Sequence, residues 1–119
     1  MDDSRPIYRR IADAIRDSVG DGAIPEGERA PSTNELAAFH SVNPNTAARA
    51  LTLLADEGLL ERRRGLGMFV VAGARDRVRA ARRARFAAGF VRPLLAEAAA
   101  LGITADELHR IIDDERTAR

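Results

Sequence analysis

The 119-residue sequence contains no cysteine, no lysine and no tryptophan, and only 4% of its residues are aromatic. The lack of cysteine excludes disulfide bonds, thiol catalysis and zinc sites with thiolate ligands. The scarcity of aromatic residues argues against a β-sandwich or barrel with an aromatic interior. No apolar run approaches the roughly 20 residues that span a bilayer, and the N-terminus lacks the features of a signal peptide. We therefore expect a soluble, cytoplasmic protein without a membrane partner.

The composition favours one compact helical domain with an appendage. Hydrophobic residues make up 45% of the chain and charged residues 31%, which permits a core. Alanine occupies 23 positions and all 19 basic residues are arginine. Both residues favour helix, although a GC-rich genome would produce the same bias.

The charges are unevenly distributed along the chain. Residues 1–61 carry six arginines against eleven acidic residues, a net charge of −5. Residues 62–92 carry ten arginines against Asp76 alone, a net charge of +9. Residues 93–119 carry three arginines against six acidic residues, a net charge of −3. A basic block between acidic flanks indicates either a local contact with a polyanion or a solvated arginine-rich helix.

Two helices are predicted in the first 42 residues. The first begins near Pro6, because proline suits the first helical position. Its apolar residues recur with helical spacing, which predicts a face packed on a core; they are Tyr8, Ile11, Ala12, Ile15 and Val19. The second helix is short and begins at Ser32-Thr33-Asn34-Glu35, which has the form of a capping box.

A third helix and a β-hairpin follow. Asn43 is a good N-cap and Pro44 suits the next position. Helical periodicity puts Ala47, Ala50, Leu51 and Leu54 on one side and Asn45, Ala48, Arg49 and Thr52 on the other. Gly58 predicts a left-handed stop. Leu59–Arg63 and Met68–Val71 then read as strands joined by a tip at residues 64–67.

The remainder of the chain is predicted to be helical from about Arg75. Gly89 and Pro93 should kink or break this helix. A second capping box at Thr104 opens a last helix. The apolar residues of this tail are too numerous to leave in water and predict a homodimer interface; they are Phe86, Phe90, Val91, Leu94, Leu95, Leu101, Leu108, Ile111 and Ile112.

The order of helix, short helix, turn, helix and hairpin is that of a winged helix-turn-helix. We therefore predict a mainly α fold with a small β-hairpin wing. Residues 1–73 would form the DNA-binding domain and residues 74–119 a short two-helix dimerisation tail. The third helix would enter the major groove of double-stranded DNA.

Individual residues are assigned to DNA by their chemistry. Asn45 can pair bidentately with adenine, and Arg49 can reach guanine or phosphate. Asn43 and Thr46 suit phosphate better than bases. At the wing, arginines stand beside two glycines that let the backbone approach a phosphate or a minor groove; these residues are Arg62, Arg63, Arg64, Gly65 and Gly67.

Each assignment has a simpler alternative. Asn43 can serve as an N-cap alone, Arg49 can be merely solvated, and the two glycines can be turn residues. The arginines between Arg75 and Arg85 either grip flanking phosphates or form the solvated start of the tail helix, and we favour the second reading. His40 and His109 are far apart, and no paired carboxylates or phosphate-binding loop are found, so we expect neither a metal, a cofactor nor an enzyme.

Seven segments resemble the DNA-binding domain of the GntR family, over roughly residues 5–71. They are Pro6-Ile7-Tyr8 with Ile11, residues 22–32 (GAIPEGERAPS), residues 35–37 (ELA), residues 42–46 (VNPNT), Ala50-Leu51, residues 57–60 (EGLL) and residues 64–70 (RGLGMFV). The VNPNT turn and the short tail with residues 101–104 (LGIT) are similar to the YtrA-like subfamily in particular.

The resemblance implies a bacterial transcription regulator, usually a repressor, that binds an operator as a homodimer. Positions matching the family's DNA contacts are Ser32, Thr33 and Asn34, then Asn43–Thr46 and Arg49, and Arg64-Gly65 at the wing. Many members carry arginine at the positions of Asn34, Pro44 and Ala48. The absence of these three arginines from this chain should weaken DNA binding.

Two further expectations concern partners. The subfamily resemblance implies control of a transporter operon. The tail has about 45 residues, which are too few for a large ligand pocket. We therefore expect any small-molecule effector to bind at the dimer interface. One alternative is a winged-helix protein-interaction module without specific DNA readout. Its basis is the acidic first half of the chain and the three missing arginines.

Overall fold

The computed structural model describes residues 5–118 and is mainly helical, with one antiparallel hairpin. The helices are α1 (Ile7–Asp21), α2 (Thr33–His40), α3 (Pro44–Asp56), α4 (Ala74–Phe86), α5 (Arg92–Ala100) and α6 (Ala105–Thr117), with a π-helical turn η1 (Ala87–Val91) between α4 and α5. The strands are β1 (Leu60–Arg63) and β2 (Gly67–Val70). The chain divides into two compact units at residues 80 and 81.

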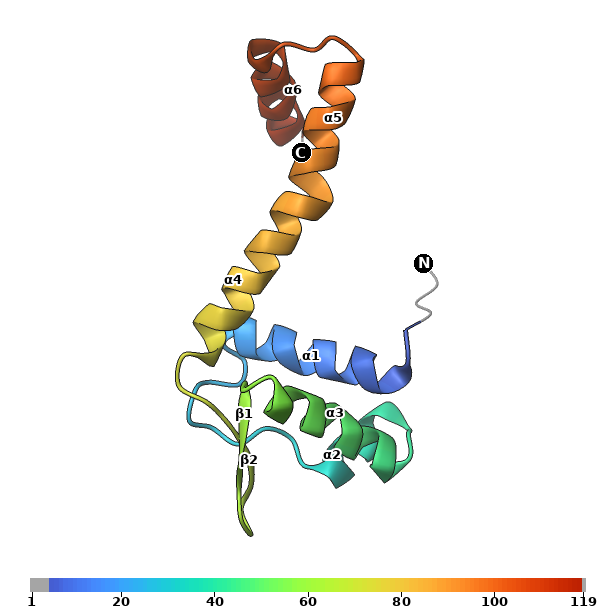
Figure 1. Cartoon of the computed structure of the whole chain (residues 1–119), viewed down its shortest axis with the longest axis vertical. Coiled ribbons are helices and arrows are strands. Elements are labelled where there is room, and N and C mark those ends of the chain that lie inside the picture. Colours follow the sequence, from blue (N-terminus) through green and yellow to red (C-terminus); the bar gives the residue numbers. More distant parts are fainter. Residues whose placement is uncertain (1–4, 119) are drawn as a thin grey trace. The chain divides into compact units, whose positions relative to one another are not determined.

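In the first unit, α1 and α3 lie side by side, with α2 beside α3 and the hairpin after α3 (Figure 1). The predicted apolar stripe of α1 is confirmed, because Ile11, Ala12, Ile15 and Val19 are buried and Tyr8 is half-buried. The predicted inward side of α3 is also buried, with Ala47, Ala50, Leu51 and Leu54 each at most 4% exposed. The fold class predicted from the sequence is therefore correct.

The predicted helix ends are formed by the expected residues, with one small correction. Pro6 is the N-cap of α1 rather than its first residue. The Ser32 and Thr104 capping boxes are both complete. Gly58 follows the C-cap of α3 and has a φ of +78°, a conformation that favours glycine.

The loop before α2 pairs with the hairpin. The Gly27 N–H donates to the Val70 carbonyl at 2.8 Å, and the Ala30 N–H donates to the Met68 carbonyl at 2.8 Å. Because Ala30, Met68 and Val70 are buried, this pairing closes the core on the hairpin side. It also holds the loop before α2 against the wing.

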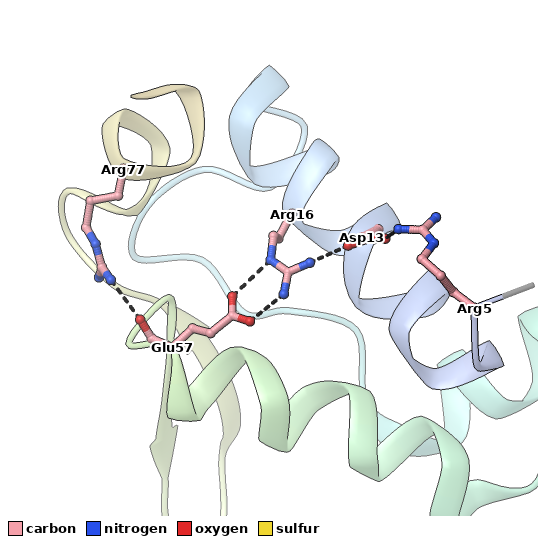
Figure 2. Close-up of polar contacts among 5 residues, drawn as sticks. All are labelled: Arg5, Asp13, Arg16, Glu57 and Arg77. Carbon is pink, nitrogen blue, oxygen red and sulfur yellow. Dashed lines mark hydrogen bonds and ion pairs between the residues drawn. The ribbon is translucent and has the colours of Figure 1, made fainter. Parts of the chain in front are cut away.

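An ion-pair network joins α1 to the end of α3 (Figure 2). The guanidinium of Arg16 contacts Glu57 through two nitrogens, and its Nε donates to Glu57 Oε1 at 2.9 Å. Arg16 also pairs with Asp13, which in turn contacts Arg5. The hydrogen bond to Glu57 is the main cause that raises the pKa of Arg16 above its ordinary value.

The start of α4 belongs to the first unit, because Ala74 and Val78 are part of the hydrophobic core. Three arginines of the basic segment donate to main-chain carbonyls: Arg75 and Arg79 to Gly20, and Arg77 to Glu57 and Gly58. For these three residues, plain solvation needs correction, whereas phosphate contact stays a prediction. The reason is that the ends of α1 and α3 present carbonyl groups that lack helical partners.

In the second unit, Ala98 of α5 is buried, and residues of α5 and α6 line one groove. The backbone remains helical from Ala74 to Ala100, so Gly89 does not break it. Gly89 lies within the irregularity that was predicted here, which is the π-helical turn Ala87–Val91 directly before the turn of Pro93. Since Pro93 has no N–H to donate, the widened turn accommodates the missing bond.

We expect Glu57→Gln to lower the free energy of unfolding by about 1 kcal/mol, because it removes the charge that pairs with Arg16. Its main-chain carbonyl is unchanged, so the bond from Arg77 is kept. Urea unfolding measures the effect, with Asp56→Asn at the exposed neighbouring position as the control. Equal stabilities of the two variants would show that the ion pair contributes nothing.

Candidate nucleic-acid interface

The first turn of α3 is presented outward. Asn43, Pro44 and Asn45 are exposed and Thr46 is half-buried, whereas Ala47 is fully buried. The Asn43 side chain accepts a hydrogen bond from the Asn45 N–H at 2.7 Å, which confirms its role as the N-cap. The cap engages the Asn45 backbone, so the exposed carboxamide of Asn45 is a candidate for reading a base edge.

The start of α2 is held by its capping box. The Ser32 N–H donates to Glu35 Oε1 at 3.0 Å, and the Glu35 N–H donates to Ser32 Oγ at 3.1 Å. Arg29 lies 3.5 Å from the same carboxylate. The hydrogen bonds from Ser32, assisted by the charge of Arg29, lower the pKa of Glu35 below its ordinary value.

The wing places its arginines on two faces. Arg62 pairs with Met68 and Arg63 with Gly67, so alternate residues of β1 point to opposite sides. The Arg63 guanidinium lies 4.2 Å from the centre of the Phe69 ring and its Nε lies 3.7 Å from Glu61. Arg64 and Gly65 at the tip are exposed, and Gly65 has a φ of +77°.

A cavity of about 310 Å³ connects α2, α3 and the wing. Five of the residues assigned to DNA from the sequence line it, namely Ser32, Thr33, Asn34, Arg62 and Gly67. The lining also includes Arg29 and Ala48. Asn34 and Ala48 are two of the positions where the resemblance leads us to expect arginine.

The cavity lining includes an arginine that the sequence-based site omitted. Arg62 was predicted as part of the wing, whereas Arg29 was not singled out. The loop that carries Arg29 is far from the wing in sequence. Backbone pairing of residues 27–30 with β2 brings this loop and the wing together. The other predicted residues lie outside this cavity; they are Asn43, Asn45, Thr46, Arg49, Arg63, Arg64 and Gly65.

Arg49 is not merely solvated. Its guanidinium lies 4.1 Å from the centre of the Tyr8 ring on α1, within the range of a cation–π contact. The other partner of this half-buried ring is the hydrophobic core, against which Tyr8 packs. Arg49 therefore has a structural partner in addition to any contact with DNA.

The family model for bacterial regulatory proteins of the gntR family matches residues 7–70, more than half of the chain. The chain belongs to the GntR family. Its first unit is the winged helix-turn-helix of that family, and the family consists of transcriptional regulators, not enzymes.

Relatives and solved structures support this membership. The chain is 35% identical over 72 residues to the HTH-type transcriptional repressor YtrA of Bacillus subtilis, a match over 60% of this chain and 55% of the relative. A GntR family transcriptional regulator from Listeria monocytogenes superposes with a TM-score of 0.73 at 25% identity, over 96% of this chain and 98% of the other.

A third comparison concerns a DNA complex. The DNA-binding domain of AraR in complex with operator ORR3 matches with a TM-score of 0.56 at 28% identity, over 60% of this chain and 86% of the other. The matched segment spans about half the length of YtrA, so the similarity to that repressor concerns the DNA-binding unit. Along residues 5–118, no helix has the length and apolar character needed to cross a membrane.

The lowered pKa of Glu35 predicts a pH-dependent contribution to stability. The contribution is complete above the unfolded-state pKa near 4.5 and is lost as the pH falls through the lowered folded-state value. We therefore expect Glu35→Gln to reduce the melting temperature at pH 7 and to have a progressively smaller effect as the pH falls below about 4.5. Glu28→Gln, in the loop before α2, is the control, and a Glu35→Gln effect that does not change with pH would contradict the prediction.

Proposed function

We propose that this chain is a sequence-specific DNA-binding transcriptional regulator that acts as a homodimer. The first turn of α3 enters the major groove, and the wing contacts the DNA backbone or the minor groove. The observation that carries the proposal is the outward presentation of Asn43, Asn45 and Thr46 at the end of a helix whose other side is buried.

The charges around α3 support the same orientation on DNA. Arg29 and Arg62 line the cavity beside the start of α2, and exposed Arg64 extends the basic surface to the tip of the wing. Guanidinium groups bind phosphate oxygens bidentately, so this surface suits a phosphate backbone on either side of the groove. Because Arg29 is beside Glu35, its charge is partly neutralised in the absence of DNA.

The tail supports the homodimer. Ala98 is the only buried residue within residues 81–118. Phe90 is 70% exposed and Phe86 is 60% exposed, and their ring centres lie 5.9 Å apart. A groove of about 630 Å³ runs along α5 and α6, lined by Leu94, Leu108, Ile111, Ile112, Glu115 and Arg116.

A second copy of the tail is the simplest cover for this apolar surface, since a two-fold axis presents the same residues to one another. The predicted interface residues Val91, Leu95 and Leu101 belong to the same tail, and Leu95 and Leu101 are exposed. The two copies would then place their α3 helices at operator half-sites about 34 Å apart, or a multiple of that distance.

The similarity to the repressor YtrA supports repression as the outcome of DNA binding. The proposed role also implies a cytoplasmic location. Control of a transporter operon and an effector at the dimer interface remain predictions from the resemblance and the size of the tail. The division into residues 1–73 and 74–119 also remains a prediction. The alternative, a protein-interaction module, is decided by the first experiment below.

We expect Asn45→Ala to reduce binding to the specific duplex by about 1–3 kcal/mol while leaving binding to a scrambled duplex unchanged. The reason is that a bidentate contact with a base distinguishes sequences, whereas a phosphate contact does not. Fluorescence anisotropy at one fixed salt concentration measures both affinities, with a specific duplex selected by the wild-type protein from a random library.

Thr52→Ala is the matched control, because Thr52 is exposed on the same helix two turns further along. Equal losses on the two duplexes would assign Asn45 to phosphate. If the wild-type protein selected no sequence over the scrambled duplex, the protein-interaction module would replace the proposed function.

We expect Phe90→Glu to convert the homodimer into a monomer, because it buries a carboxylate in an apolar interface. Sedimentation velocity measures the mass, and circular dichroism verifies the fold. Arg85→Glu, which adds a carboxylate to an exposed position of α4, should leave the dimer intact. A Phe90→Glu dimer of unchanged mass would show that the interface lies elsewhere.

A further inference from the structure

Arginines on two sides of α4 donate hydrogen bonds to main-chain carbonyls at the ends of α1 and α3. Arg75 Nε and Arg79 Nη1 both donate to the Gly20 carbonyl, at 3.2 and 3.3 Å. Arg77 donates to the Gly58 carbonyl at 2.9 Å and to the Glu57 carbonyl at 2.7 Å. The first unit therefore holds the start of α4 at the C-terminal ends of both α1 and α3.

Helical geometry explains this division. Ala74 and Val78 are four residues apart and form the buried side of α4, with exposed fractions of 0% and 4%. Arg75 and Arg79 also form an i, i+4 pair, and they lie on one flank of that side. Arg77 lies on the other flank. The buried side chains set the position of the helix, and the arginines hold it from both flanks.

The carbonyl partners are well suited to cations. The last carbonyls of a helix have no partner within it, and they form the negative end of the helix dipole. A guanidinium offers several fixed donors and keeps its charge, so one arginine can satisfy two such carbonyls. Arg77 does this at the end of α3, while the side chain of Glu57 pairs with Arg16 on α1 (Figure 2).

Two further features fit the arginines at these positions. A Cβ on Gly58 would lie 3.3 Å from Arg77 Nη1, and one on Gly22 would lie 3.5 Å from the Arg75 guanidinium carbon. Both glycines have a positive φ, so they end their helices and also leave room for the guanidinium groups. The Arg75 N–H donates to Glu26 at 3.1 Å, which caps α4 from a distant loop.

We propose that Arg75, Arg77 and Arg79 are positioning residues that fasten the first two turns of α4 to the DNA-binding unit and thereby set the spacing of the operator half-sites. We call the three arginines the α4 latch. The spacing role rests on the proposed function, because it needs a dimer joined through the tail. We expect a dimer whose α4 is loose at its start to tolerate many half-site spacings, and one whose α4 is fastened there to tolerate fewer.

Hydrogen exchange tests the latch without DNA. In full-length Arg75→Gln/Arg77→Gln/Arg79→Gln, we expect the amides of residues 78–81 to exchange about tenfold faster than in the wild type. Arg83→Gln/Arg85→Gln is the control, since both arginines are exposed on the same helix beyond the latch and neither shows a polar partner within residues 5–118. Equal exchange in the latch and control variants would overturn the latch.

Spacer variation tests the consequence. The probe is the duplex selected by the wild-type protein, with 5 or 10 base pairs inserted between the half-sites. Five base pairs turn one half-site by about half a helical turn, and ten restore the phase. We expect the 5-base-pair insertion to cost the wild type and the control about a hundredfold in affinity, and the latch variant about tenfold or less.

The outcomes separate the two proposals. Faster exchange together with an unchanged spacer penalty would overturn the spacing role, although the latch would stand. A wild-type protein that selects no duplex would overturn the proposed function and the spacing role with it, while exchange still decides the latch. If circular dichroism shows the triple variant to be unfolded, the same two measurements on Arg77→Gln against Arg83→Gln decide the question.

Discussion

The burial of one side of α3 against α1 is the constraint on which the rest of this structure depends. Ala47, Ala50, Leu51 and Leu54 are removed from water, together with Ile11 and Ile15 of α1. Because a helix turns by about 100° per residue, fixing the inward side also fixes which residues face outward. The exposure of Asn43 and Asn45 is therefore a consequence of core packing. No further structural feature is needed to expose these side chains to DNA.

Arginine performs several different tasks in this protein. Arg16 pairs with Glu57, Arg49 and Arg63 lie over the aromatic rings of Tyr8 and Phe69, and the α4 latch binds carbonyl groups. Each task uses the planar, permanently charged guanidinium in a way that lysine would serve less well. The strongly basic block in the sequence is consequently not one surface with one role. Part of it stabilises helix ends, and part of it, at the wing, remains exposed.

The two units differ in how far they satisfy their own apolar surface. The first has a core drawn from α1, α2, α3, the hairpin and the start of α4. The second buries only Ala98 within residues 81–118 and leaves Phe86, Phe90 and Leu101 at least 60% exposed. Exposed aromatic and aliphatic side chains at this density are typical of an association surface. This contrast supports assigning sequence reading to the first unit and assembly to the second.

Local chemistry determined much of this protein from its sequence: the apolar stripes of α1 and α3, the caps at Ser32, Asn43 and Thr104, and the stop at Gly58 depend only on neighbours a few residues away. Only the tertiary structure decided which arginines meet which partners. Arg29 joins the wing through backbone pairing, and Arg77 reaches the carbonyl of Glu57, 20 residues earlier in the chain. Such partners depend on where separate helices end in space. The periodicity of the sequence does not predict these positions.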